Sequence, residues 1–216
     1  MKMMGRKGWI LLALAVQCAG LGWLIGRYER VVTGGTEVRF ACSAYDPYDP
    51  FRGRYLQTRV VAVCADVPPS MTNESWIVSR KDLFVQVDPT GGTNGFARVV
   101  RVAEQPSAEG LWVKPKRVDI ESTIGSQEKG KDETWDDFDK RRRLAPKKAS
   151  VHFPDQFFVN EKIAREAEIC LRRTNSVPVA VYRIRGGACV LTGIEIDGRP
   201  IADHVRAAHA EAARKK

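Results

Sequence analysis

The chain has 216 residues, a formal net charge of +9, five cysteines and three histidines. The positive charge is concentrated at the two ends, with a net +4 in residues 1–30 and +2 in residues 203–216, so residues 31–202 carry an ordinary mixed surface. This distribution argues against a nucleic-acid-binding protein, in which basic residues gather on one face of the folded domain.

The first informative segment is the apolar run from Trp9 to Ile25, in which Gln17 is the one polar side chain. As a helix this run is about 25 Å long, which is close to the hydrocarbon thickness of a bilayer. Lys2, Arg6 and Lys7 precede it, as in both cleaved signal peptides and retained signal anchors. Because the apolar run continues past its small-residue cluster without a cleavage site, we expect a retained single-pass anchor.

The charge before the anchor predicts its orientation. An excess of Lys and Arg marks the cytoplasmic side, so we expect a cytoplasmic amino terminus and an extracytoplasmic bulk, periplasmic in a bacterium. Cys18 suggests a lipoprotein as an alternative, but Gln17 stands where a small residue precedes a lipidated cysteine. We therefore divide the chain into a cytoplasmic stub and anchor (1–30), an extracytoplasmic domain (31–202) and a basic tail (203–216).

Short β-rich stretches separated by Gly- and Pro-containing turns follow the anchor. They predict a mainly β domain of the α+β class, with a barrel- or sandwich-like arrangement. Apolar residues at helical spacing predict one helix within 157–173, and the tail is expected to be helical but frayed. The expected strands cover 36–44, 55–64, 82–88, 96–103 and 111–116, with a hairpin of 177–184 and 188–196 that turns at Gly186-Gly187.

Residues 125–150 interrupt this pattern with a charged block that is acidic first and basic at its end. We interpret the block as a solvated insertion with about one helical turn around Trp135. The alternative is a docking segment for lipid headgroups or a partner, with Trp135 and Phe138 as apolar anchors and with the block's basic end attracted to anionic lipid.

Four cysteines lie in the expected exported domain: Cys42, Cys64, Cys170 and Cys189. An oxidising compartment permits disulfides, and four cysteines allow three pairings between which the sequence does not choose. The other interpretation is that some of them are free thiols that act as small buried hydrophobic residues. Both interpretations are open at this point.

The sequence contains no nucleophile motif, no phosphate-binding glycine loop and no metal-ligand spacing. His204 and His209 fall in the tail, and His152 stands alone in an expected strand, where a structural role is usual. We therefore predict no catalytic residue, metal site or cofactor, and favour a binding or assembly module over an enzyme. A membrane-tethered hydrolase with an unrecognised active site, such as a Ser/Lys pair, is the alternative.

The densest local signal is the stretch DPYDPFRGRY, from Asp46 to Tyr55. Two Asp-Pro pairs and Gly53 predict a rigid double turn that orients the flanking strands. The functional interpretation is that Asp46, Asp49, Arg52 and Tyr55 form a rim that binds a ligand or partner.

This stretch resembles the membrane-anchored proteins named after the signature Gly-Asp-Tyr-x-x-Leu-x-Tyr. Gly53 and Tyr55 match, whereas Arg54, Thr58 and Val60 replace the Asp, the Leu and the second Tyr, as in a divergent member. Further similarity lies in FPDQFFVNEKIAREAE (153–168) and in the hairpin VAVYRIRGGACVLTGIEIDGRP (179–200).

The resemblance implies an anchored, β-rich extracytoplasmic domain and supplies no reaction. It also implies a multi-pass membrane protein as a partner, in addition to the lipid bilayer itself. The oligomeric state is left open by the sequence.

Overall fold

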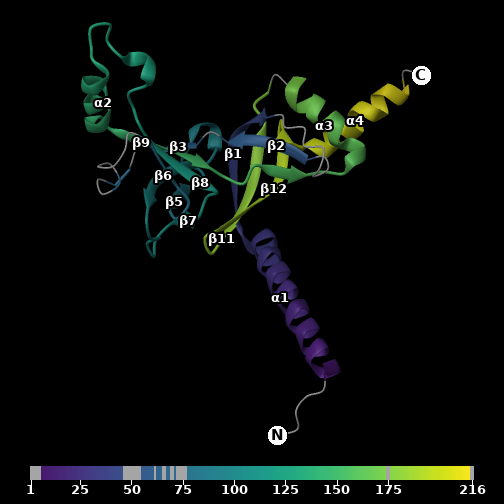
Figure 1. Ribbon diagram of the computed structural model, residues 1–216. Coiled ribbons are helices and arrows are strands. Elements are labelled where there is room, and N and C mark those ends of the chain that lie inside the picture. The colour runs from purple at the N-terminus through teal and green to yellow at the C-terminus, as the bar shows by residue number, and fades with distance from the viewer. Residues whose placement is uncertain are drawn as a thin grey trace.

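The computed structural model describes residues 6–45, 55–60, 62–64, 67–68, 71, 77–173 and 176–214. Helix α1 (Arg6–Gly34) leaves the domain as a separate rod (Figure 1). Its length and apolar composition make Lys7–Gly34 a candidate membrane span. The apolar helix expected at Trp9 to Ile25 is therefore present, and it continues about two and a half turns further before the first strand.

The largest sheet has six antiparallel strands in the order β10-β2-β1-β11-β12-β13. Gly186 and Gly187 form the tight turn between β11 and β12 with φ values of 55° and 80°, a conformation that strains residues with a Cβ. The predicted glycine hairpin is thus confirmed. The six strands are β1 (Thr36–Tyr45), β2 (Tyr55–Val60), β10 (Gln156–Phe158), β11 (Val179–Arg185), β12 (Ala188–Ile196) and β13 (Arg199–Pro200).

Two smaller antiparallel sheets stand beside the first one (Figure 1). One has the order β3-β9-β8-β4 and the other β6-β5-β7. The first comprises β3 (Ala62–Cys64), β9 (Lys147–His152), β8 (Arg117–Ser122) and β4 (Ile77–Arg80). The second comprises β6 (Arg98–Ala103), β5 (Phe84–Asp88) and β7 (Leu111–Val113), and a short 3-10 turn (Thr93–Gly95) precedes β6.

One hydrophobic core joins the three sheets. Val38 on β1, Val85 on β5, Val118 on β8 and Val151 on β9 all belong to the same buried cluster. In β8 and β9, buried side chains alternate with partly or fully exposed ones, as expected where one face of a sheet packs on a core. The predicted class, mainly β within α+β, is confirmed.

A second, smaller core lies under two helices, α3 (Glu161–Arg173) and α4 (Ile201–Arg214). Ala167 and Leu171 of α3 are buried there, which confirms the predicted helix. The tail differs from the expectation, since its first turns are packed rather than frayed. Ile201 and Val205 lie four residues apart on one face of α4, and both are buried in this core.

The charged insertion is more regular than expected. It contains a 3-10 turn (Ser126–Glu128) and a ten-residue helix, α2 (Trp135–Leu144), which protrudes at the end of the domain opposite α3 and α4, away from α1 (Figure 1). Phe138 is fully buried, with the guanidinium groups of Arg141 and Arg142 over its ring at 5.2 Å and 5.4 Å. The segment 147–150, expected to be loop, is instead the start of β9.

The five cysteines are all free thiols. Cys42 and Cys64 are buried, and the Cys64 thiol lies 3.0 Å from the carbonyl oxygen of Val100. Burial raises the pKa of Cys42 and of Cys189 to about 12. The interpretation of some of the cysteines as free, buried small residues therefore holds for Cys42 and Cys64, whereas Cys170 and Cys189 are partly buried free thiols, and none of the four forms a disulfide.

Candidate functional site

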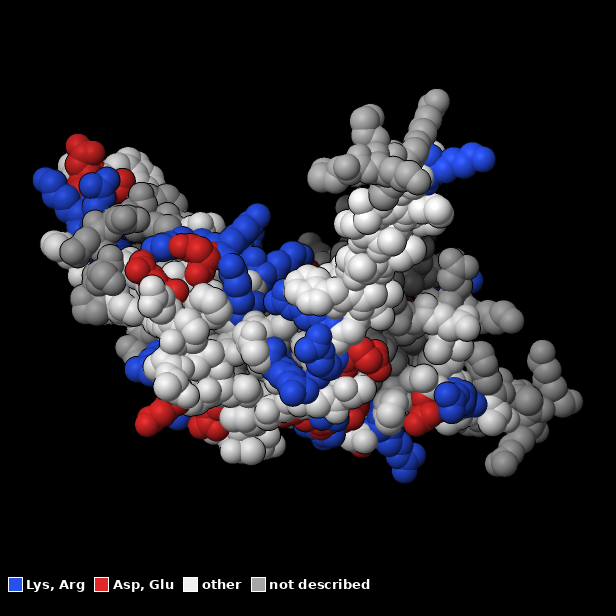
Figure 2. Space-filling model, turned by 90° about the horizontal axis from the view of Figure 1, so that it is seen from below, with Lys and Arg blue, Asp and Glu red and all other residues white. Residues whose placement is uncertain are grey.

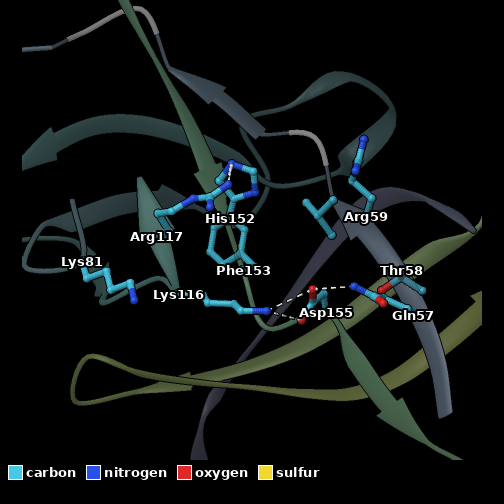
Figure 3. Close-up of a pocket in the computed structure, with 10 residues that line it drawn as sticks. Gln57, Thr58, Arg59, Lys81, Lys116, Arg117, His152, Phe153 and Asp155 are labelled. Carbon is cyan, nitrogen blue, oxygen red and sulfur yellow. Dashed lines mark hydrogen bonds and ion pairs between the residues drawn. The ribbon is translucent and has the colours of Figure 1, made fainter. Parts of the chain in front are cut away.

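A cavity of about 460 Å³ lies where the six-stranded sheet meets the β3-β9-β8-β4 sheet (Figure 3). We call it the basic cleft. Strand β2, the β4–β5 turn, the start of β8 and the connection from β9 to β10 contribute its walls. The lining residues are Gln57, Thr58, Arg59, Val60, Lys81, Lys116, Arg117, His152, Phe153 and Asp155.

The connection from β9 to β10 is held rigidly against the core. Phe153 is 3% exposed, and its ring centroid lies 4.8 Å from that of Phe40 and 5.6 Å from that of Tyr182. The Tyr182 hydroxyl donates a hydrogen bond of 2.7 Å to the carbonyl oxygen of Pro154. The following residue, Asp155, is therefore presented to the cleft from a fixed backbone.

Asp155 ties this connection to two other walls. Its carboxylate accepts hydrogen bonds from the Gln57 amide at 2.9 Å and from the Lys116 ammonium group at 3.0 Å (Figure 3). Its carbonyl oxygen accepts from the Thr58 N–H at 2.9 Å, and the Lys116 N–H donates to the carbonyl oxygen of His152 at 2.8 Å. The positions of Gln57 and Lys116 in the cleft are consequently fixed by backbone and side-chain bonds together.

A second carboxylate, Asp119 on β8, organises the other wall. It accepts from Ser79 Oγ at 2.5 Å, from Arg117 Nη2 at 2.9 Å and from His152 Nε2 at 2.8 Å. Arg117 and the His152 ring therefore lie side by side (Figure 3). The carboxylate, rather than the imidazole, is the central member, so this arrangement differs from a Ser-His-Asp triad, in which histidine bonds the serine.

Positive charge dominates the lining of the basic cleft. The lining contains four cations, Arg59, Lys81, Lys116 and Arg117, and one carboxylate, that of Asp155, while Asp119, outside the lining, is ion-paired with Arg117. Within the described part of the chain, Lys81 has no ion-pair partner. Cations that converge on a concave site favour an anionic group such as a phosphate or carboxylate, and the cavity is of a size usual for small-molecule sites.

A buried hydroxyl adds a polar group beside the basic cleft. Thr58 is fully buried, and its Oγ1 has no hydrogen-bond partner among the described residues. Across those same residues, no three His, Cys, Asp or Glu side chains gather as a group able to hold a metal ion. The described residues of the basic cleft can therefore attract an anionic ligand by charge and donate hydrogen bonds to it.

Three of the four rim residues expected from the sequence, Asp46, Asp49 and Arg52, lie outside the described residues. Tyr55 begins β2 opposite Phe158 of β10, on the strand whose following residues line the basic cleft. The rim remains a prediction. The sequence did not single out Lys116 or Asp155 as site residues. Of the lining residues, His152 was noticed from the sequence, but a structural role was expected for it.

Fold and cleft together define a β-rich domain joined to one long apolar helix. The model of the family described as GDYXXLXY protein matches residues 17–194, from within α1 to within β12, the second hairpin strand. The chain therefore belongs to the GDYXXLXY family, as its sequence resemblance predicted, and the matched region contains every lining residue of the basic cleft. No curated protein and no solved structure matches the chain.

Proposed function

We propose that this protein is a membrane-anchored, extracytoplasmic binding module whose basic cleft receives the anionic part of a ligand or envelope partner. The observation that carries the proposal is that four cations line the basic cleft against two carboxylates, Asp155 in the lining and Asp119 bonded to Arg117, and that Lys81 makes no ion pair within the described residues. A concave surface of one sign concentrates oppositely charged ligands because field lines converge there.

Helix α1 supports the proposed location of the domain at a membrane. The apolar side chains between Trp9 and Ile25 are exposed along α1, as they would be if lipid covered them. The basic residues before the span favour a cytoplasmic amino terminus, which supports an extracytoplasmic location of the basic cleft. A ligand of this module is therefore an anion of the envelope: a small phosphate or carboxylate compound, or an acidic group on a multi-pass partner.

The geometry suits a phosphate group in particular. A guanidinium presents several donors in a planar fork, and ammonium groups act as point charges that adapt to the ligand. Asp119 fixes the plane of Arg117 from one side, while Lys81 and Lys116 approach as ammonium groups. These three donor groups could bind a tetrahedral anion without a change in the backbone.

The test is a calorimetric titration of the detergent-solubilised full chain with inorganic phosphate. Lys81→Gln is the sharpest variant, because it removes a lining cation whose loss breaks no ion pair. Lys140→Gln on α2 is the matched control, since Lys140 is exposed and makes one 3.8 Å contact with Asp137. We expect about tenfold weaker phosphate binding for Lys81→Gln and no change for the control. Absence of binding to the wild type, or equal affinities for all three proteins, contradicts the proposal.

A hydrolase is the second candidate, and one observation favours it. The His152 ring lies 2.8 Å from Asp119 at the basic cleft, and a carboxylate in this position orients an imidazole as a general base. Ser79 bonds Asp119 instead of His152, so no nucleophile is paired with the ring in the described residues. Turnover of p-nitrophenyl phosphate by the wild type, lost in His152→Gln, would make the protein a hydrolase. Phosphate binding without turnover supports the binding module.

A further inference from the structure

The junction between α1 and the domain is close-packed. Val31, in the last turn of α1, is 4% exposed, and its carbonyl oxygen accepts a 2.9 Å hydrogen bond from the Gly35 N–H. Arg183 of β11 donates to the Gly35 carbonyl oxygen at 3.1 Å. The helix thus passes into β1 without a linker, and the anchor determines which face of the domain is turned towards the membrane.

Two further elements meet the end of α1. Arg185, at the end of β11, donates from Nη1 to the Arg30 carbonyl oxygen at 3.2 Å. The turn that follows pairs with the end of β7, since Val113 bridges Gly187 and the Lys114 N–H donates to the Gly187 carbonyl oxygen at 2.8 Å. The β11–β12 turn and the end of β7 are therefore side by side next to α1 (Figure 1).

The height of this region above the bilayer core follows from the helix rise. Arg30 comes five residues after Ile25, the last residue of the apolar run, which is about 7.5 Å along the axis. A bilayer extends about 5–7 Å beyond its hydrocarbon core on each side, as its headgroup layers. The Arg185 guanidinium, bonded to Arg30, therefore lies at the outer edge of the headgroup layer when α1 spans the membrane.

The side chains at this level are cationic, and Figure 2 shows Lys and Arg gathered on the face beside the base of α1. We call Arg27, Arg30, Lys114 and Arg185 the foot residues. Among the described residues, none of the four makes an ion pair. Arg27 lies over the Trp23 ring at 5.8 Å and Lys114 over the Phe84 ring at 5.9 Å.

The acidic residues nearby do not cancel this charge. Glu29 lies among the foot residues on α1. Glu37 is bonded to Arg183 at 2.7 Å, and Asp82 to Arg80 at 2.6 Å, although Asp82 also attracts Lys114 electrostatically. A net positive surface remains where phosphate headgroups would touch the domain.

We propose that the foot residues bind anionic lipid headgroups of the bilayer that α1 crosses, and so hold the domain against the membrane in one orientation. This rests on α1 being the membrane span and is independent of the basic cleft. It also assigns the lipid contact to a different place from the insertion, because α2 protrudes away from α1 and Arg142 and Lys147 are buried there (Figure 1).

The experiment uses the full chain in nanodiscs of phosphatidylcholine, alone or mixed with phosphatidylglycerol. Hydrogen exchange of the Gly186–Gly187 turn and of the Lys114 amide reports contact with the bilayer. We expect slower exchange at these amides in the anionic discs, and loss of the difference at high salt, because each cation near an anionic surface strengthens association about fivefold.

Two variants and one control separate the lipid contact from folding. Arg185→Gln also removes the bond to Arg30, so Lys114→Gln, which keeps its backbone bond to Gly187, is the cleaner variant. Lys131→Gln combined with Lys140→Gln removes two exposed cations from the insertion as the control. Reduced protection in Lys114→Gln and in Arg185→Gln, with full protection in the control, supports the proposal. Equal exchange in both lipids, or undiminished protection in Lys114→Gln, overturns it.

Discussion

Tyr182 donates its hydroxyl hydrogen to the carbonyl oxygen of Pro154 across 2.7 Å, and this bond fixes one wall of the basic cleft. Tyr182 is fully buried at the centre of β11, and burial raises its pKa well above 10, so the hydroxyl stays a donor at any physiological pH. The core of the six-stranded sheet thereby holds the connection that carries Phe153 and Asp155.

Replacing Tyr182 by Phe keeps the ring and removes the bond. The Pro154 carbonyl then loses its donor in a half-buried site, which costs about 1–3 kcal/mol of unfolding free energy. We expect a lower melting temperature and weaker phosphate binding. Tyr28→Phe, on the exposed surface of α1, is the matched control and should change neither quantity. A Tyr182→Phe protein as stable as the wild type would show that the bond does not hold this wall.

The insertion can be deleted without unfolding the domain only as far as the residue pairs that join β8 to β9 at its base. The Thr123 N–H donates to the Pro146 carbonyl oxygen at 2.9 Å, and Ser122 pairs with Lys147 where β8 meets β9. Phe138 packs within the insertion and belongs to neither hydrophobic core. Replacing 125–144 with a short glycine linker should therefore leave the domain folded, as judged by its melting curve and circular dichroism.

A longer deletion, of 126–148, should have the opposite result. It removes Lys147 and Lys148 from β9, and with them the pairs to Ser122 and Glu121 of β8. We expect a substantially lower melting temperature than for the shorter deletion. Equal stability of the two deletions would show that the first residues of β9 contribute nothing to the sheet.

Because two thiols are shielded from water, we expect the free energy of unfolding to depend on pH in the alkaline range. An unfolded cysteine ionises near pH 9, whereas burial raises the pKa of Cys42 and of Cys189 to about 12. Between these values the unfolded chain releases protons that the folded chain retains, so the free energy of unfolding falls as pH rises from about 9 to 12. Below pH 9 these two groups add no pH dependence.

The measurement is the melting temperature of the wild type and of Cys42→Ala across this pH range. The substitution leaves a small cavity and lowers stability at every pH, so the slope is the informative quantity. We expect a shallower fall with pH in Cys42→Ala, and a shallower one still when Cys189→Ala is added. Parallel curves for all the proteins would contradict the assignment of these thiols as buried.

A substitution at Gly35 tests the close packing between α1 and the domain. A Cβ at this position would collide with the carbonyl oxygen of Val31 and lie 3.1 Å from backbone atoms of Ile184. These backbone atoms cannot move aside as the end of a flexible side chain can. Gly35→Ala should therefore cost about 1–3 kcal/mol of unfolding free energy. Gly20→Ala, in the middle of α1 with open space around it, is the control and should leave the domain's melting temperature unchanged.

Local patterns explain which parts of this fold are readable from sequence. The alternation in β1, the glycine turn before β12 and the apolar spacing of α3 are each encoded within about ten neighbouring residues. The ordered insertion was harder to foresee, because its one buried aromatic side chain, Phe138, lies in a block in which charged residues predominate. Likewise, the side chains of α4 that the structure describes put two residues into the core, Ile201 and Val205, in an alanine-rich tail.

The basic cleft is a product of tertiary structure. Gln57 and Asp155 are 98 positions apart and meet because β2 and β10 are neighbours in the sheet. Lys116 and His152 come together through the pairing of β8 with β9. No spacing in the sequence connects these residues, so composition and motif reasoning had no means of grouping them. The predicted rim of Asp46, Asp49, Arg52 and Tyr55 was conspicuous for the opposite reason, because its residues lie within one ten-residue stretch.

The most direct test of the basic cleft as an anion-binding site uses its histidine. The chain has three histidines, so selectively labelled protein gives three imidazole signals that single substitutions assign. His152 lines the basic cleft, whereas His204 bonds the Ile196 carbonyl oxygen at 2.8 Å, away from it. On titration of the full chain with inorganic phosphate, we expect a saturable shift of the His152 signal, no shift of His204, and loss of the effect in Lys81→Gln. An unmoved His152 signal, or equal drift of all three signals, would contradict it.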